Sequence, residues 1–154
     1  MGLNVGELAP AVSLPAHGGG RIDLAALRGQ KVVLFFYPKA DTTACTQEAV
    51  DFTALAADFA AAGAVVIGIS RDPVKALGRF AGKHGLGVIL GSDEDGGVVE
   101  AYGVWVEKSM YGKSYMGIER TTVLVDAAGR VARIWPKVKV KGHAAEVLEA
   151  ARAL

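Results

Sequence analysis

The order of apolar runs along the chain predicts an α/β fold, in which a mixed β-sheet is flanked by helices. Two short apolar runs, at 31–37 and 64–69, enclose a segment of helical periodicity. This order is typical of a parallel strand–helix–strand unit with a right-handed crossover. Two strands joined by a turn at 121–135 and a helix at 143–154 follow. A chain of this length suits one domain, so we expect residues 1–154 to form a single domain.

The first unit of the fold consists of two strands and the helix between them. The run KVVLFFY at 31–37 is apolar throughout and rich in β-branched and aromatic residues, which predicts a strand buried on both faces. The run AVVIGI at 64–69 has the same character. The helix between them is expected over about 43–62, and its apolar face holds Phe52, Leu55, Ala56 and Phe59.

Three further elements complete the sheet and its cover. A second helix is predicted to begin at Asp72 and Pro73, because Asp is a good N-cap and Pro suits the first helical position. The segment 121–135 predicts a hairpin with its turn near Gly129. The last helix, at 143–154, places five apolar residues on one face: Ala144, Val147, Leu148, Ala151 and Leu154. This order of elements fits the thioredoxin-like architecture.

The composition indicates a globular protein and excludes several classes of partner. Hydrophobic residues make up 51% of the chain and charged residues 21%, which is enough apolar material for a full core. Because the net charge is only +1, we expect neither nucleic acid nor an anionic membrane surface as a partner. The lysines of KVKVK at 137–141 alternate as in an exposed strand and are interpreted as solvated.

The sequence carries no pattern of export or membrane insertion. The N-terminal residues MGLNVGELAP lack a basic region followed by an apolar core, and no apolar run is long enough to cross a bilayer. The one cysteine, Cys45, cannot form an intramolecular disulfide. We therefore expect a cytoplasmic protein in a reducing compartment.

No motif supports a metal ion or an organic cofactor. His17, His84 and His143 are scattered and share no ligand spacing. The acidic run SDEDGG at 92–97 lacks the spacing of an EF-hand and is interpreted as a turn that caps a helix from Val98. Because the G-x-G-x-x-G and P-loop motifs are absent, nucleotide binding is not expected either.

Cys45 is the strongest candidate for chemistry. It lies on the apolar face of the predicted helix, and free cysteine is among the most buried residue types, so an inert core position would also explain it. Its place in the opening turn of the helix favours the reactive thiolate, because unpaired N–H groups and the helix dipole point near the sulfur. The helix also follows a buried strand, whose carboxyl end is the usual ligand site of α/β sheets. Thr42, one turn earlier, would offer a hydroxyl to the same pocket or serve as the N-cap.

The stretch around Cys45 resembles the active-site signature of peroxiredoxins. Pro38, Thr42 and Cys45 have the spacing P-x-x-x-T-x-x-C, and the longer run FFYPKADTTACTQEA resembles the Q-type, or bacterioferritin-comigratory (BCP), branch. Further similarity lies in GISRD, SDED, YGVW and MYGKSYMGIERTTVLVD, so the resemblance spans nearly the whole chain. It implies the peroxiredoxin variant of the thioredoxin-like fold and a thiol-dependent peroxidase that reduces hydrogen peroxide and organic hydroperoxides.

The resemblance also implies a role for each matching residue. Cys45 would be the peroxidatic nucleophile and would become a sulfenic acid. Thr42 would hydrogen-bond the thiolate and the peroxide, and Pro38 would shield the pocket. Arg120 would place a guanidinium beside the sulfur, which favours the thiolate and the charge on the leaving oxygen. Glu48 could orient Arg120. Without the resemblance, Arg120 would be interpreted as a surface arginine and Glu48 as a solvated helix charge.

The sequence departs from the branch at two places. Thr43 and Ala44 stand where the branch usually has Pro-Gly. The resolving cysteine is absent, because Val50 and Ala81 occupy the two positions at which the family places it. The resemblance therefore implies a one-cysteine mechanism with an external thiol reductant, such as thioredoxin or glutaredoxin with glutathione. Because the branch is often monomeric, we expect a monomer, which could form a Cys45-linked dimer on oxidation.

Two other functions for the same cysteine stay open at this point. One is a redox sensor, in which oxidation of Cys45 signals to a partner protein. The other is a thioredoxin-like thiol transferase, which is weakened because position 42 is Thr and no C-x-x-C motif exists.

Overall fold

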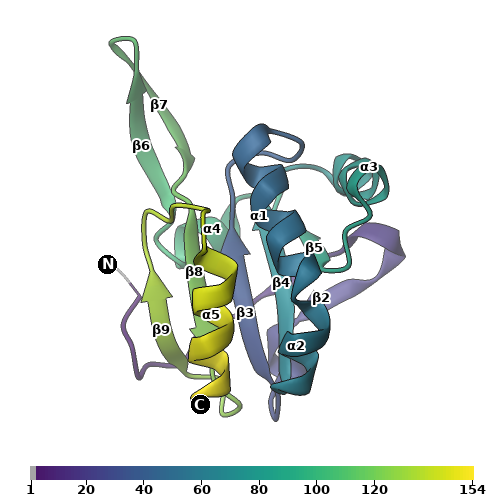
Figure 1. Cartoon of the computed structure of the whole chain (residues 1–154). Coiled ribbons are helices and arrows are strands. Elements are labelled where there is room, and N and C mark those ends of the chain that lie inside the picture. The colour runs from purple at the N-terminus through teal and green to yellow at the C-terminus, as the bar shows by residue number, and fades with distance from the viewer. Residues whose placement is uncertain (1–2) are drawn as a thin grey trace.

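The computed structural model describes residues 3–154 and has a five-stranded mixed sheet at its centre (Figure 1). The strands, in spatial order, are β5 (Ile89–Ser92), β4 (Ala64–Ser70), β3 (Lys31–Phe36), β8 (Thr121–Val125) and β9 (Val131–Trp135). Strands β3, β4 and β5 are parallel to one another, whereas β8 is antiparallel to both β3 and β9. The expected mixed sheet, its parallel unit and the hairpin of β8 and β9 are confirmed.

Helices cover both faces of this sheet. The helices are α1 (Thr43–Ala54), α2 (Ala56–Ala61), α3 (Val74–His84), α4 (Gly97–Ala101) and α5 (His143–Arg152). Apolar side chains of α1, α2, α3 and α5 form one core cluster, and α1, α2 and α5 lie side by side in front of the sheet in Figure 1. Helix α4 contributes to a second cluster on the opposite face, together with β1 (Ser13–Pro15) and β2 (Arg21–Asp23).

The central strand β3 supplies both cores because its side chains alternate between the two faces. Val33 and Phe35 belong to the cluster under α1 and α5, whereas Val32, Leu34 and Phe36 belong to the cluster under α4. All five side chains are buried, as the apolar run predicted. The carboxyl end of β3 leads directly into the loop before α1, so the packed sheet fixes where that loop and helix begin.

Two local expectations about helices were wrong. The helix expected at 43–62 is divided in two, because Leu55 leaves helical geometry (φ −102°, ψ 8°) between α1 and α2. Asp72 does not cap α3, which begins at Val74 after Pro73. Its carboxylate instead accepts hydrogen bonds from the Ala40 amide at 2.8 Å and the Ser70 hydroxyl at 2.7 Å.

The lysine-rich segment at 137–141 forms no strand in the structure. Pro136 has no amide hydrogen to donate to a strand ladder, and Lys137 adopts a left-handed backbone conformation (φ 49°). The side chains still alternate in exposure along the segment, and the Val138 amide donates to the Arg120 carbonyl at 2.9 Å. The segment therefore lies beside Arg120, the residue directly before β8.

A second hairpin, which the sequence analysis did not predict, projects beyond the end of the sheet. It consists of β6 (Trp105–Met110) and β7 (Lys113–Ile118), and Figure 1 shows it standing beside the N-terminal end of α1. The acidic turn before α4 was predicted correctly, because the Asp93 carboxylate accepts a hydrogen bond from the Val99 amide at 2.8 Å. Among residues 3–154, no helix is long and apolar enough to cross a membrane.

Candidate active site

Cys45 lies in the first turn of α1, at the end of the sheet where β3 delivers the chain. Its side chain is 1% exposed and packs in the cluster under α1 and α5. Thr42 is the N-cap residue of the helix, and its carbonyl accepts the first helical hydrogen bond from the Thr46 amide at 2.8 Å. The sulfur is therefore buried and lies close to the positive end of the helix.

Arg120 connects Cys45 to Glu48 although it lies 75 and 72 positions away from them in the chain. Its Nη2 donates to Cys45 Sγ at 3.3 Å, and its Nη1 donates to Glu48 Oε1 at 2.7 Å. The side chain of Arg120 is 15% exposed and that of Glu48 is 1% exposed. One guanidinium thus bridges a buried thiol and a buried carboxyl group, a geometry for which its planar set of donors is suited.

The electrostatics of this cluster are set by burial. Burial raises the pKa of the Glu48 carboxyl to about 7, although the charge of Arg120 and its hydrogen bond act against the rise. Burial alone would lower the pKa of the Arg120 guanidinium, but Glu48 and Cys45 reverse that effect and its pKa is raised. Arg120 is therefore a fixed cation beside the sulfur, and Glu48 is a carboxyl group that exchanges its proton near neutral pH.

Two polar atoms of this region have no hydrogen-bond partner among the described residues. They are the second carboxyl oxygen of Glu48, Oε2, and the hydroxyl of Tyr37. Tyr37 follows β3 directly, and burial raises the pKa of its hydroxyl. The Tyr37 hydroxyl therefore remains protonated near neutral pH and adds no negative charge to the cluster.

Thr42 and Pro38 flank the site on its solvent side. The Thr42 hydroxyl donates to the Lys39 carbonyl at 2.8 Å and bonds to no helix amide. Within the described residues it makes no hydrogen bond to Cys45 Sγ. Thr42 is therefore near Cys45 in the sequence, but its hydroxyl is not paired with the sulfur. Pro38 is exposed and lines a groove that opens beside the site.

Lys108 is a residue of this region that the sequence analysis missed. It is partly buried on β6, and its Nζ donates to the Ile118 carbonyl. Burial lowers the pKa of its ammonium, Arg120 lowers it further, and Glu119 and Cys45 oppose the shift. No sequence pattern marked it, because most side chains of the hairpin that carries it are exposed and neither face is apolar.

The histidines are placed apart and take part in separate contacts. His17 accepts from the Leu90 amide, His84 bonds to Asp41, and His143 bonds to the Thr122 hydroxyl. Among residues 3–154, no three His, Cys, Asp or Glu side chains gather in a way that could hold a metal ion.

Comparison with known proteins agrees with this fold. Residues 5–134 match the model of the AhpC/TSA family. Peroxiredoxin Bcp of Bacillus subtilis is 43% identical over 149 residues, which cover 97% of this chain and 95% of that protein. A structure of the Xanthomonas campestris bacterioferritin comigratory protein, from a study of its alkyl peroxide reduction activity, has a TM-score of 0.88 and 44% sequence identity. The match covers 92% of this chain and 90% of the other.

A cysteine-to-serine variant of Xylella fastidiosa PrxQ is similar over almost the full length. Its TM-score is 0.94 at 36% identity, with 99% of this chain and 98% of the other covered. The fold and these relatives define a thiol-dependent peroxidase, an oxidoreductase of thioredoxin-like architecture. The chain belongs to the AhpC/TSA family, and its relatives are the Bcp and PrxQ peroxiredoxins.

Proposed function

We propose that Cys45 is the peroxidatic nucleophile of this peroxidase. The observation that carries the proposal is the contact of Arg120 with both Cys45 Sγ and Glu48, because a fixed cation at 3.3 Å stabilises a thiolate. The thiolate attacks the distal oxygen of a hydroperoxide, and the S–O bond forms as the O–O bond breaks. The leaving alkoxide or hydroxide takes a proton and departs as alcohol or water, which leaves Cys45 as a sulfenic acid.

The other predicted residues have supporting roles in this proposal. Arg120 stabilises the charge that moves onto the leaving oxygen, and Glu48 holds Arg120 in position. Thr42 turns its hydroxyl from the Lys39 carbonyl to the bound peroxide and fixes the in-line geometry. Pro38 limits the approach of water at the mouth of the site.

An external thiol restores Cys45 in this proposal. The chain has one cysteine, and Ala81, at one position of the family's resolving residue, is buried in α3. A disulfide between two copies would need the two sulfur atoms at about 2.05 Å. The 1% exposure of Cys45 opposes this, so a reductant that can enter the site is favoured. The reducing cytoplasm would supply such thiols.

A relative supports the substrate range that we propose. The Xanthomonas campestris protein is described by its alkyl peroxide reduction activity. We extend this to the present chain, together with hydrogen peroxide, because the two chains are 44% identical and 92% of this chain is covered.

Intact mass spectrometry tests the proposed function. Reduced protein treated with one equivalent of hydrogen peroxide should gain the mass of one oxygen atom, and Cys45→Ser should gain none. Addition of dithiothreitol, glutathione with glutaredoxin, or reduced thioredoxin should then return the original mass and support repeated turnover. Protein that is oxidised but is not returned by any of these thiols would be a sensor, and the proposal would be rejected.

A further inference from the structure

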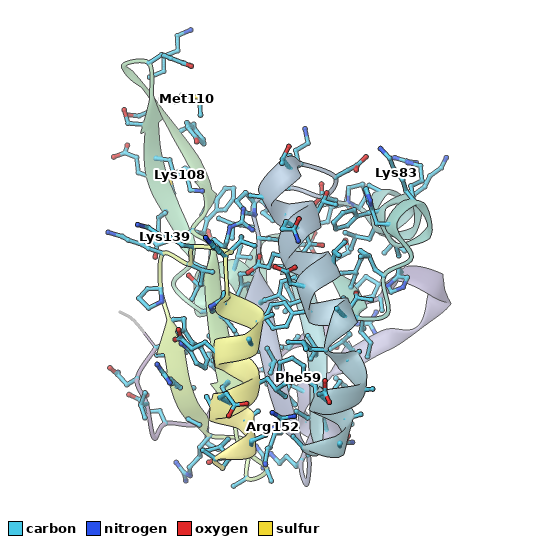
Figure 2. All side chains as sticks on the ribbon, viewed as in Figure 1. Phe59, Lys83, Lys108, Met110, Lys139 and Arg152 are labelled. Atoms are coloured by element: carbon cyan, nitrogen blue, oxygen red, sulfur yellow. The ribbon has the colours of Figure 1, made fainter. Side chains whose placement is uncertain are left out.

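A groove of about 500 Å³ opens beside the site, between the loop after β3 and the projecting hairpin. Its volume is in the range of small-molecule sites in proteins. Figure 2 shows Lys108 on this hairpin. The lining residues are Pro38, Lys39, Arg71, Glu94, Trp105, Lys108, Tyr115, Met116, Gly117 and Ile118. The groove therefore shares Pro38 with the proposed peroxide site.

Three cations line this groove and lack acidic partners. Within residues 3–154, no ion pair with a carboxylate involves Lys39, Arg71 or Lys108. Arg71 is held with its guanidinium 4.5 Å from the centre of the Trp105 ring and donates to the Glu94 carbonyl at 3.1 Å. Glu94 is the one acidic residue of the lining, so the groove has a net positive charge.

The remaining wall of the groove is largely apolar. Trp105, Met116 and Ile118 line it, and Gly117 allows two long side chains to lie across the strand. A Cβ atom at Gly117 would come within 3.3 Å of Lys108 Cδ and 3.4 Å of Tyr115 Cε2. The absence of a side chain at Gly117 thus lets Lys108 and Tyr115 reach over the groove. Such a wall suits a ligand that carries anionic groups on a partly apolar body.

The position of the groove relates it to the reduction of Cys45. Pro38, which lines the groove, lies in the loop that leads from β3 to α1, and Ile118, which also lines it, lies two positions before Arg120. The hairpin projects beside the start of α1, as Figure 1 shows. A small molecule can enter between the hairpin and the Pro38 loop.

We propose that this groove binds a low-molecular-weight thiol that carries carboxylate groups, and that this thiol reduces oxidised Cys45. The inference rests on the proposed function, because it needs a sulfenic acid at Cys45. The thiolate of the bound molecule attacks the Cys45 sulfur, an S–S bond forms as the S–O bond breaks, and hydroxide leaves and is protonated to water. A second thiolate then attacks the ligand sulfur, which releases the Cys45 thiolate and a symmetrical disulfide of the reductant.

Glutathione and its diethyl ester form a matched pair of probes, because they share the thiol and differ in the two carboxylates. Protein oxidised by one equivalent of hydrogen peroxide should be reduced about tenfold faster by glutathione than by the ester, after correction for thiolate fraction. The preference should shrink in 0.5 M salt, since salt screens exposed charges. S-methylglutathione should bind the reduced protein in calorimetry, and its diester should bind more weakly.

Variants of the cations test whether the groove is responsible. Arg71→Gln and Lys39→Gln should each lower the preference for glutathione over its ester by about fivefold. Arg133→Gln is the matched control, because Arg133 also lies 4.5 Å over a tryptophan ring, that of Trp135, but outside the groove. It should leave the preference unchanged.

Three results would overturn the inference. Equal reduction by glutathione and its ester would do so, as would reduction by thioredoxin alone. A preference for carboxylated over esterified alkyl hydroperoxides in the oxidation step, without any preference in the reduction step, would assign the groove to the peroxide instead. Failure of the proposed function gives a different result, because Cys45 would then gain no oxygen while S-methylglutathione binding could still be measured.

Discussion

Arg120 illustrates at the scale of single residues why the site needs a guanidinium. Its two terminal nitrogens donate to different acceptors, Cys45 Sγ at 3.3 Å and Glu48 Oε1 at 2.7 Å. A lysine ammonium would offer the charge without the fixed fork. This arrangement buries the carboxyl group of Glu48, which is energetically unfavourable. One of its oxygens has no hydrogen-bond partner among the described residues.

Glu48 should make the stability of the protein depend on pH. Its pKa is about 7 in the folded chain against an ordinary value of 4.5, so between these two pH values the folded state holds a proton that the unfolded state has lost. The contribution of Glu48 to the free energy of unfolding should therefore fall by roughly 2–3 kcal/mol as the pH rises from 4.5 to 7. Glu48→Gln should remove this slope in urea titrations. A slope that is unchanged in the variant would contradict the prediction.

Thr42 and Thr43 form a matched pair for testing the role of the hydroxyl. Thr42→Val should lower the rate of Cys45 oxidation by hydrogen peroxide about tenfold or more, because a hydrogen bond to a charged reacting group is lost. Thr43→Val, at the neighbouring exposed position, should change the rate less than twofold. Stopped-flow fluorescence can follow both variants, and equal rates for the two would exclude a role for Thr42.

At the scale of elements, the loop before α1 is fastened to the end of α3. Asp41 has a left-handed backbone conformation (φ 64°), and its carboxylate contacts Lys83 Nζ at 2.9 Å and His84 Nε2 at 2.8 Å. Hydrogen bonds from His84 and Lys83 hold the pKa of Asp41 below its ordinary value. The contacts are therefore present at neutral pH and are lost as the pH falls through the lowered pKa of Asp41.

Removal of the Asp41 charge should loosen this connection. Asp41→Asn keeps a residue type that tolerates the left-handed conformation but loses the ion pairs. Amide hydrogen exchange in the loop after β3 and in the last turn of α3 should rise by at most about fivefold, because exposed ion pairs are weak. Asp51→Asn is the control, since the Asp51 carboxylate accepts a hydrogen bond from Gln47 within α1 and forms no ion pair among residues 3–154. Equal exchange in the two variants would count against the connection.

Two glycines show how packing decides the effect of one methyl group. A Cβ atom at Gly68 in β4 would lie 2.5 Å from Phe35 Cζ, whereas one at Gly78 on α3 meets nothing within 4 Å. Gly68→Ala should lower the free energy of unfolding by about 1–3 kcal/mol through overpacking. Gly78→Ala should raise it by about 0.5–1 kcal/mol through helix propensity. Thermal unfolding distinguishes them, and stabilisation by Gly68→Ala would contradict the packing.

The elements that were predictable from the sequence are those with strong local periodicity. The runs that became β3 and β4 are apolar throughout because they are buried on both faces, and the turn near Gly129 marked the next hairpin. Hairpin β6–β7 was missed because most of its side chains are exposed, so neither face is apolar. Asp72 was misinterpreted as a cap because its tertiary partner, Ala40, lies 32 positions earlier in the chain.

The residues of the candidate site differ in how far the sequence predicted their place in it. The helix position of Cys45 follows from local sequence, but its contact with Arg120 joins residues 75 positions apart, and only the resemblance to a family indicated it. Lys39, Arg71 and Lys108 come from three separate segments, so no sequence pattern could gather them. Long-range placement of charged side chains depends on how the sheet and hairpin pack.

At the scale of the whole molecule, the central sheet connects the two apolar core clusters to the candidate active site. Side chains of β3 belong to both apolar clusters, and the same strand leads to the loop that carries Pro38 and Thr42. The expectation that residues 1–154 form one domain stays a prediction, which a single cooperative unfolding transition would support.

The rate at which Cys45 reacts with hydrogen peroxide at neutral pH tests the central claim most directly. The second-order rate constant, measured by stopped-flow tryptophan fluorescence, should exceed that of free cysteine by on the order of a hundredfold or more. Arg120→Ala should remove most of this acceleration, and Arg133→Ala should not. A Cys45 that reacts no faster than free cysteine, or that reacts equally fast without Arg120, would contradict the account.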